Sequence, residues 1–302
     1  MRAIYLSLWL LSLGTASLAE TPKVMVDISP VHALVSMVMG ETGAPGLLLQ
    51  KGADPHDFQL RPSQAQELEA ADLVIWVGPE MSPWLGRTLD GLGRGTGLAL
   101  LDAPQTLTRS FTEAAEEVHD HEADDHAHEG LDPHAWLDPE NARIWLGLIA
   151  DALAQADPAQ AAVYRSNADA AQARVTEIET EVTALLAPVA KRPFAVTHDA
   201  YGYFAAHFGL EVIGSLRMGD AAPPGAAHVA ELEDALKSQG AICLFTEANH
   251  NDTSARQMAA ATGIRLGAPL DPEGSMLTPG AAVYGELMLG LAKSISDCLS
   301  AQ

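Results

Sequence analysis

Three histidines of the sequence stand in short polar segments that could hold a metal ion. His56 lies in Ala-Asp-Pro-His-Asp-Phe, His134 in Leu-Asp-Pro-His-Ala-Trp, and His198 in Thr-His-Asp-Ala-Tyr. A neutral imidazole nitrogen is a favoured zinc ligand, and Asp271, in Leu-Asp-Pro, could add a carboxylate oxygen. For any one of these residues a hydrogen-bonded structural role is the alternative, so a metal site requires the fold to bring them together.

The elements around these residues indicate how they could meet. Continuous apolar runs at 72–77 and 241–246, with further strand candidates at 23–27 and 194–197, alternate with helical stretches. This alternation is typical of α/β units with mostly parallel sheets, whose sites lie beyond the carboxyl ends of the strands. Two of the histidine segments belong to the first half of the chain and one to the second, so a shared site would lie between two lobes.

A long helix is expected to join the lobes. Asp157 is a candidate N-cap, Pro158 fits the first helical position, and Pro188 would end the helix. We therefore expect an N-terminal α/β lobe over 20–156, a rigid connecting helix over 157–188, and a C-terminal α/β lobe over 189–302. An ordinary helix within one larger domain is the alternative.

A segment rich in acids and histidine interrupts the first lobe at 113–130. It has no apolar periodicity, so we expect a flexible loop. Its four histidines could form an auxiliary, low-affinity metal site, or the segment could be a solvated acidic linker; the residues are His119, His121, His126 and His128. The spacing of His121 and His126 is i, i+5, which does not match the HExxH pattern of zinc proteases.

The composition and the first residues of the chain limit the classes of protein to which it could belong. The 302 residues carry a formal net charge of −23, which repels nucleic-acid phosphate, and a hydrophobic fraction of 48% is ample for a folded core. Residues 1–19 resemble a secretory signal with cleavage expected before Glu20, which predicts an exported protein. In an oxidising compartment Cys243 and Cys298 are expected to form one disulfide.

Several motifs in one order resemble a known family. The chain resembles the cluster A-I (cluster 9) substrate-binding proteins of metal ABC importers in three segments, ADPHDFQLRPSQ, DPHAWLDPENA and VTHDAYGYFAAHFGL. The resemblance includes a His-rich loop before the DPH segment and an LDP segment late in the sequence. Within that family the chain is most similar to the periplasmic zinc-binding members of high-affinity zinc uptake systems. The resemblance runs from about Lys23 to Leu299.

The resemblance implies a ligand set and a function. The ligands would be His56, His134 and His198, with Asp271 or water in the fourth position. The protein would be a monomer and not an enzyme; it would capture Zn²⁺ as transported ligand and deliver it to an ABC permease, with a periplasmic zinc chaperone as a further possible partner. Manganese-binding relatives usually have Glu where His198 stands, and three imidazoles suit zinc better than manganese.

Other functions stay open at this point. A zinc-dependent periplasmic hydrolase would need an open coordination position beside a general base. A manganese-binding member of the same family, an adhesin or a metal chaperone would share the fold. Nearby acids could orient the ligand rings, or could instead be caps and turn residues; they are Asp57, Asp132, Asp138, Asp199 and Glu247. His250 is one further histidine near the expected cleft.

Overall fold

The computed structural model describes residues 21–56, 58–92, 97–111, 130–217, 225–248 and 250–301. The expected signal segment and the four loop histidines lie outside these ranges. Within the described residues, no helix combines the length and the apolar character that crossing a membrane requires.

Two four-stranded sheets, one in each half of the described chain, form the framework, and every strand pair in them is parallel. The N-terminal sheet has the order β2-β1-β3-β4, with β1 Val24–Val26, β2 Gly46–Leu47, β3 Leu73–Trp76 and β4 Gly97–Ala99. The C-terminal sheet has the order β6-β5-β7-β8, with β5 Phe194–His198, β6 Val212–Arg217, β7 Cys243–Phe245 and β8 Arg265–Leu266. The predicted α/β fold of two lobes is confirmed.

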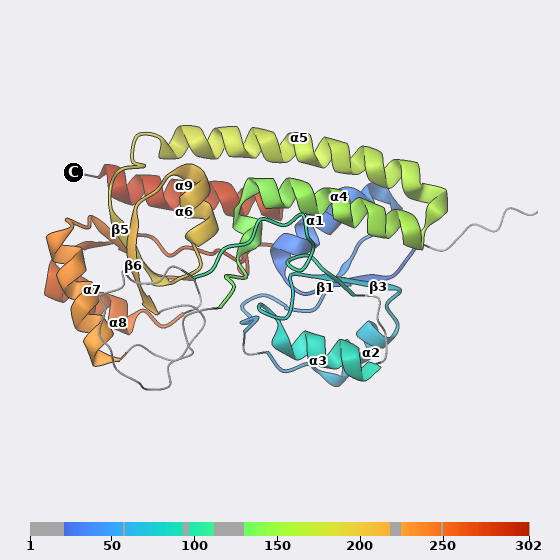
Figure 1. Cartoon of the computed structure of the whole chain (residues 1–302), viewed down its shortest axis with the longest axis horizontal. Helices are drawn as coiled ribbons and strands as arrows, with labels where there is room; N and C mark the ends of the chain where they lie inside the picture. Colours follow the sequence, from blue (N-terminus) through green and yellow to red (C-terminus); the bar gives the residue numbers. More distant parts are fainter. Residues whose placement is uncertain are drawn as a thin grey trace, which may run out of the picture.

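Helices cover the sheets and connect the lobes (Figure 1). Those of the N-terminal lobe are α1 Ser29–Met39, α2 Pro62–Glu69 and α3 Pro83–Leu92. Those of the C-terminal lobe are α6 Gly202–Phe208, α7 Ala226–Ser238 and α8 Thr253–Thr262. The other described α-helices, α4 Pro139–Ala156, α5 Ala161–Leu186 and α9 Val283–Ser300, lie together along one side of the molecule, where α5 runs from the N-terminal lobe toward the C-terminal sheet.

The connecting helix α5 has a buried stripe whose residues are three or four positions apart. That stripe consists of Tyr164, Ala168, Ala171, Val175, Ile178, Val182 and Leu186. Such spacing places one face against a core, and α5 packs against α1, α4 and α9. Its 26 residues span about 39 Å at 1.5 Å per residue, enough to reach both lobes.

The start of the connecting helix differs from the prediction. Asp157 ends α4, and a 3₁₀ turn over Pro158–Gln160 precedes α5, which begins at Ala161. The Asp157 side chain does not cap this turn and instead accepts a hydrogen bond from the Tyr164 hydroxyl at 3.3 Å. The helix α4 was not predicted from the sequence, although Asp138 caps it by accepting from the Glu140 N–H.

The predicted disulfide is confirmed. Cys243 at the start of β7 is bonded to Cys298 in α9, with 55 residues of sequence separation. Closing a loop of this length stabilises the folded chain by about 4 kcal/mol in the chain-entropy account. The bond fastens the last helix to the central part of the C-terminal sheet.

A half-buried ionic network joins the C-terminal lobe to the helices α4 and α5. His207 in α6 lies 2.8 Å from Asp138 through Nδ1 and 2.8 Å from Glu179 of α5 through Nε2. Glu179 also accepts from Arg143 of α4 at 2.5 Å. The hydrogen bond to Asp138, followed by the one to Glu179, raises the pKa of His207.

This network predicts a pH-dependent contribution to stability. Because the folded-state pKa of His207 is raised, its stabilisation is complete below the unfolded value near 6.5 and is lost as pH rises through the folded value. We expect His207→Gln to lower the free energy of unfolding of metal-free protein more at pH 6 than at pH 9, as measured by urea denaturation. His228→Gln is the matched control, because its Nε2 lies 2.9 Å from the uncharged Ser215 carbonyl oxygen. Equal losses at both pH values would contradict the assignment.

Candidate metal centre

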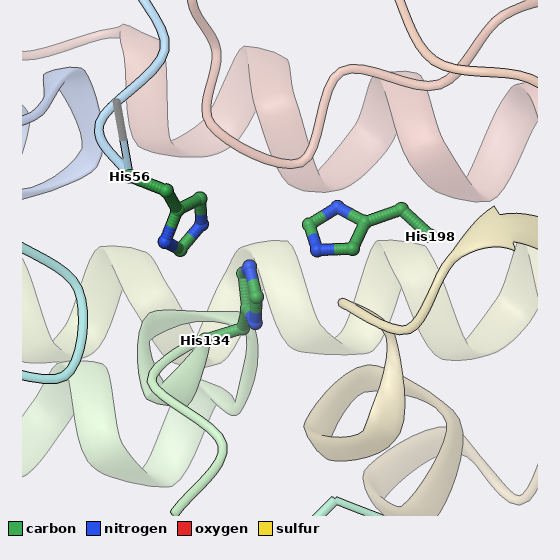
Figure 2. A group of neighbouring side chains, drawn as sticks. All are labelled: His56, His134 and His198. Carbon is green, nitrogen blue, oxygen red and sulfur yellow. The ribbon is translucent and has the colours of Figure 1, made fainter. Parts of the chain in front are cut away.

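Three imidazoles converge between the lobes (Figure 2). One ring nitrogen from each of His56, His134 and His198 lies within 4.8 Å of the other two. The ring centroids are 5.9 Å apart for His56 and His134, 6.1 Å for His56 and His198, and 5.1 Å for His134 and His198. The fold therefore gathers the three histidines that the sequence singled out.

His134 is oriented by an acid two residues before it. Asp132 Oδ1 accepts from the His134 backbone N–H at 2.9 Å and lies 2.8 Å from Nδ1 of the ring. A carboxylate only accepts here, so Nδ1 carries the hydrogen and Nε2 keeps its lone pair. That Nε2 is buried with no hydrogen-bond partner among the described residues. A buried nitrogen left in this way is suited to a metal ion.

His198 ends the strand β5 and is held by an acid that follows the neighbouring strand β7. Both oxygens of Glu247 lie 3.2 Å from His198 Nδ1, and Tyr201 donates its hydroxyl to Glu247 at 3.0 Å. In the order β6-β5-β7-β8, the chain adds β6 on one side of β5 and then β7 and β8 on the other side. His198 and Glu247 therefore lie at the topological switch point of the sheet, between β5 and β7. Burial alone would raise the pKa of Glu247, but His198 and His250 hold it below its usual range.

His56 comes from the loop between β2 and α2 and is half-buried. Asp54 accepts from the His56 backbone N–H at 2.9 Å. Within the same lobe, the buried Trp84 indole N–H donates to the Pro55 carbonyl at 2.9 Å, and its ring packs on Phe58. Trp84 therefore fixes the backbone beside the ligand, a role that sequence spacing did not reveal.

His250 links the two lobes beside the centre. Its Nδ1 lies 2.9 Å from Glu247 of the C-terminal lobe, and its Nε2 lies 3.9 Å from Asp54 of the N-terminal lobe. The contacts with Asp54 and then Glu247 raise the pKa of His250 to about 9. In return, His250 lowers the pKa of Asp54 to about 2. His250 is accordingly a cation at neutral pH between two carboxylates.

Asp271 lies outside the group of three histidines. Its Oδ1 accepts from the backbone N–H and hydroxyl of Ser275 at 2.9 and 3.2 Å, and its Oδ2 accepts from the Met276 N–H at 2.9 Å. Both oxygens thus shape a turn, and its place as fourth ligand stays a prediction beside water. Nearby, burial and the Glu247 carboxylate raise the pKa of Glu273, which the sequence analysis did not single out.

The other expected orienting acids have different outcomes. Asp132 and Glu247 contact ligand rings as expected. Asp138 instead caps α4 and pairs with His207. Asp57 lies outside the described residues, as do the loop histidines, and Asp199 is half-buried directly after His198.

Trp136 lies against the centre. Its ring centroid is 5.2 Å from that of His134, and the side chain is fully buried. The indole N–H donates to the Pro272 carbonyl of the C-terminal lobe at 2.8 Å. The Trp136 carbonyl in turn accepts from the Tyr284 hydroxyl of α9 at 3.2 Å. The segment that carries His134 is therefore bonded to the opposite lobe.

Comparison with known sequences identifies close relatives. The profile of the ZnuA family, described as zinc-uptake complex component A, periplasmic, matches residues 24–298. The high-affinity zinc uptake system protein ZnuA of Paracoccus denitrificans is 44% identical, with 96% of each chain covered. The protein of the same name from Brucella suis is 35% identical, with 95% of this chain and 94% of that protein covered.

Solved structures share the fold. A ZnuA deletion mutant (138–173) with zinc bound superposes with a TM-score of 0.76 at 23% identity, covering 93% of this chain and 99% of the other. FpvC of Pseudomonas aeruginosa in complex with Mn²⁺ superposes with a TM-score of 0.80 at 21% identity and the same coverage. Proteins bound to different metals thus share this architecture, and the metal must be argued from the ligands.

Proposed function

This chain belongs to the ZnuA family of periplasmic zinc-uptake components, and we propose that its three interlobe histidines capture Zn²⁺ for delivery to the membrane permease of an ABC importer. The family is one of substrate-binding transport components and not of enzymes. Zinc is accordingly the cargo of the protein, bound and released without chemical change.

The observation that carries this proposal is the convergence of three imidazoles from both lobes. Zn–N bonds of 2.0–2.1 Å in a tetrahedral site place neighbouring nitrogens about 3.3 Å apart. The three candidate nitrogens lie within 4.8 Å of one another, so contraction by about 1.5 Å or less would complete the zinc geometry. The buried Nε2 of His134 gains a partner when zinc binds, which offsets the cost of burying it alone.

The ligand chemistry favours zinc over manganese. All three gathered groups are imidazoles, which suit a borderline ion, whereas manganese prefers carboxylate, carbonyl and water oxygens. The carboxylates of Asp132 and Glu247 are engaged with the Nδ1 atoms of His134 and His198. They increase the basicity of the rings and fix their orientation.

Location and partner follow from the family. Its members are periplasmic, and we propose that residues 1–19 direct export and are removed before Glu20. The mature, loaded protein then docks on an ABC permease as a monomer. A periplasmic zinc chaperone that supplies the ion is a further possible partner.

Replacing the ligands one at a time tests the centre. We expect His56→Ala, His134→Ala and His198→Ala each to weaken zinc binding by at least about 100-fold, because each removes one of three protein ligands. The measurement is competition with a chromophoric chelator, with apo-state unfolding midpoints to verify folding. His228→Ala is the matched control in the C-terminal lobe. Tight binding that survives the triple change would exclude this centre.

The His-rich segment is tested by deletion. Removing residues 116–129 takes away all four loop histidines and leaves the three interlobe histidines in place. We expect calorimetry to show one tight zinc site with unchanged affinity and loss of any weak additional sites. A large loss of affinity at the tight site would show that the segment supplies a ligand to it.

Asp271→Asn separates the two candidates for the fourth ligand. A carboxylate ligand would make the change cost at least about tenfold in zinc affinity. A water ligand would leave the affinity within about threefold, since Asn retains one of the acceptors of the turn. We expect the smaller effect, because both Asp271 oxygens already accept hydrogen bonds. Chelator competition at pH 7.5 distinguishes the two results.

A further inference from the structure

The three histidines of the centre differ in how they are attached to the C-terminal lobe. His198 lies in the C-terminal sheet, and the His134 segment is bonded to the same lobe through Trp136 and its buried indole N–H. A second tie is made by Tyr203 of α6, whose hydroxyl donates to the Asp132 carbonyl at 3.1 Å. Two of the three imidazoles thus belong to one packed framework, which is ready to receive an ion.

The loop that carries His56 has a weaker hold on this framework. Inside its own lobe it is fixed by Trp84, which bonds the Pro55 carbonyl. Toward the C-terminal lobe, the Gly52 N–H donates to the Ser275 carbonyl over a long 3.3 Å. The Asp54 side chain also forms an ion pair with His250 across the gap, at 3.9 Å.

His250 completes a continuous path between two ligands. From His198 the path runs through Glu247 to His250 at 3.2 and then 2.9 Å. It continues to Asp54 at 3.9 Å, and Asp54 bonds the backbone of His56 at 2.9 Å. The step from His250 to Asp54 is the longest of the path and the one that crosses between the lobes.

We propose that His250 is a positioning residue that draws the His56 loop onto the C-terminal lobe and so retains zinc already held by His134 and His198. This inference rests on the proposed zinc-binding function. The approach of His56 required for zinc geometry would carry Asp54 in the same direction. The 3.9 Å ion pair would then shorten to a charge-assisted hydrogen bond of about 2.8 Å.

The path predicts which kinetic constant His250 controls. In this scheme zinc first meets His134 and His198, a step in which the His250 contact takes no part, so we expect the association rate to change little. Release requires His56 to leave, and the His250 contact opposes that step. Because both partners are partly exposed, at 36% and 44%, the expected effect is a roughly three- to tenfold faster release.

The test uses His250→Ala, Asp54→Asn and the double variant in the full mature chain. Asp54→Asn keeps an oxygen that can accept from the His56 N–H and removes only the charge. Zinc release is followed by stopped flow with a chelator in excess. Each single change should accelerate release by about three- to tenfold, and the double variant should be no faster than the faster single one, because both remove the same contact.

Controls separate a positioning role from a general loss of structure. His228→Ala should release zinc at the wild-type rate, and every variant should still unfold in one cooperative transition in the apo state. His250→Gln retains a neutral donor and should lie between wild type and His250→Ala. The visible spectrum of bound Co²⁺ should keep its tetrahedral form in every His250 variant, because the three ligands remain.

The outcomes distinguish a failure of the role proposed for His250 from a failure of the proposed zinc-binding function. If wild-type protein binds no zinc, or if His134→Ala binds it as wild type does, the proposed function fails. If wild type and His134→Ala behave as expected but His250→Ala releases zinc at the wild-type rate, the role of His250 is overturned. A release rate in the double variant that is accelerated by the product of the two single effects would also overturn it, since it would show two independent contacts.

Discussion

The buried hydrogen bonds from Asp132 and Glu247 to imidazole Nδ1 atoms are the interactions on which the centre depends. Each carboxylate is removed from water, which is costly unless its oxygens are bonded. Each ring is removed from water too, and the bond to Nδ1 leaves Nε2 as the atom available to an ion. Loss of either acid would leave an imidazole free to rotate and to change tautomer, so the orientation of these two rings depends on the acids that contact their Nδ1 atoms.

Two parallel sheets supply the places where these bonds can form. His198 and Glu247 follow adjacent strands β5 and β7, so the sheet itself determines their separation. In the N-terminal lobe, Asp27 after β1 is fully buried and accepts from the Val77 N–H after β3 at 3.0 Å, fixing the loops at the same end of that sheet. The helix α5, packed on α1, α4 and α9, then holds one sheet relative to the other.

Sequence patterns predicted the elements better than the contacts between them. Apolar runs at 72–77 and 241–246 became the buried strands β3 and β7, since a strand covered on both faces needs such a run. The three histidines were found because their motifs are local. The partnership of Trp84 with Pro55 and that of His250 with Asp54 were not, because each joins residues far apart in sequence whose proximity depends on how the elements pack.

An acidic protein can favour zinc if its carboxylates attract the cation while imidazole nitrogens coordinate it. A net charge of −23 and the carboxylates near the centre draw in any divalent cation. If those carboxylates lined the site directly, ions that prefer oxygen would bind as readily. Here Asp132 and Glu247 are bonded to ring nitrogens, while Asp54 faces the His250 cation. In the proposed centre the ion would experience negative charge at a distance and imidazole nitrogen at contact, and the contact atoms would favour a borderline metal.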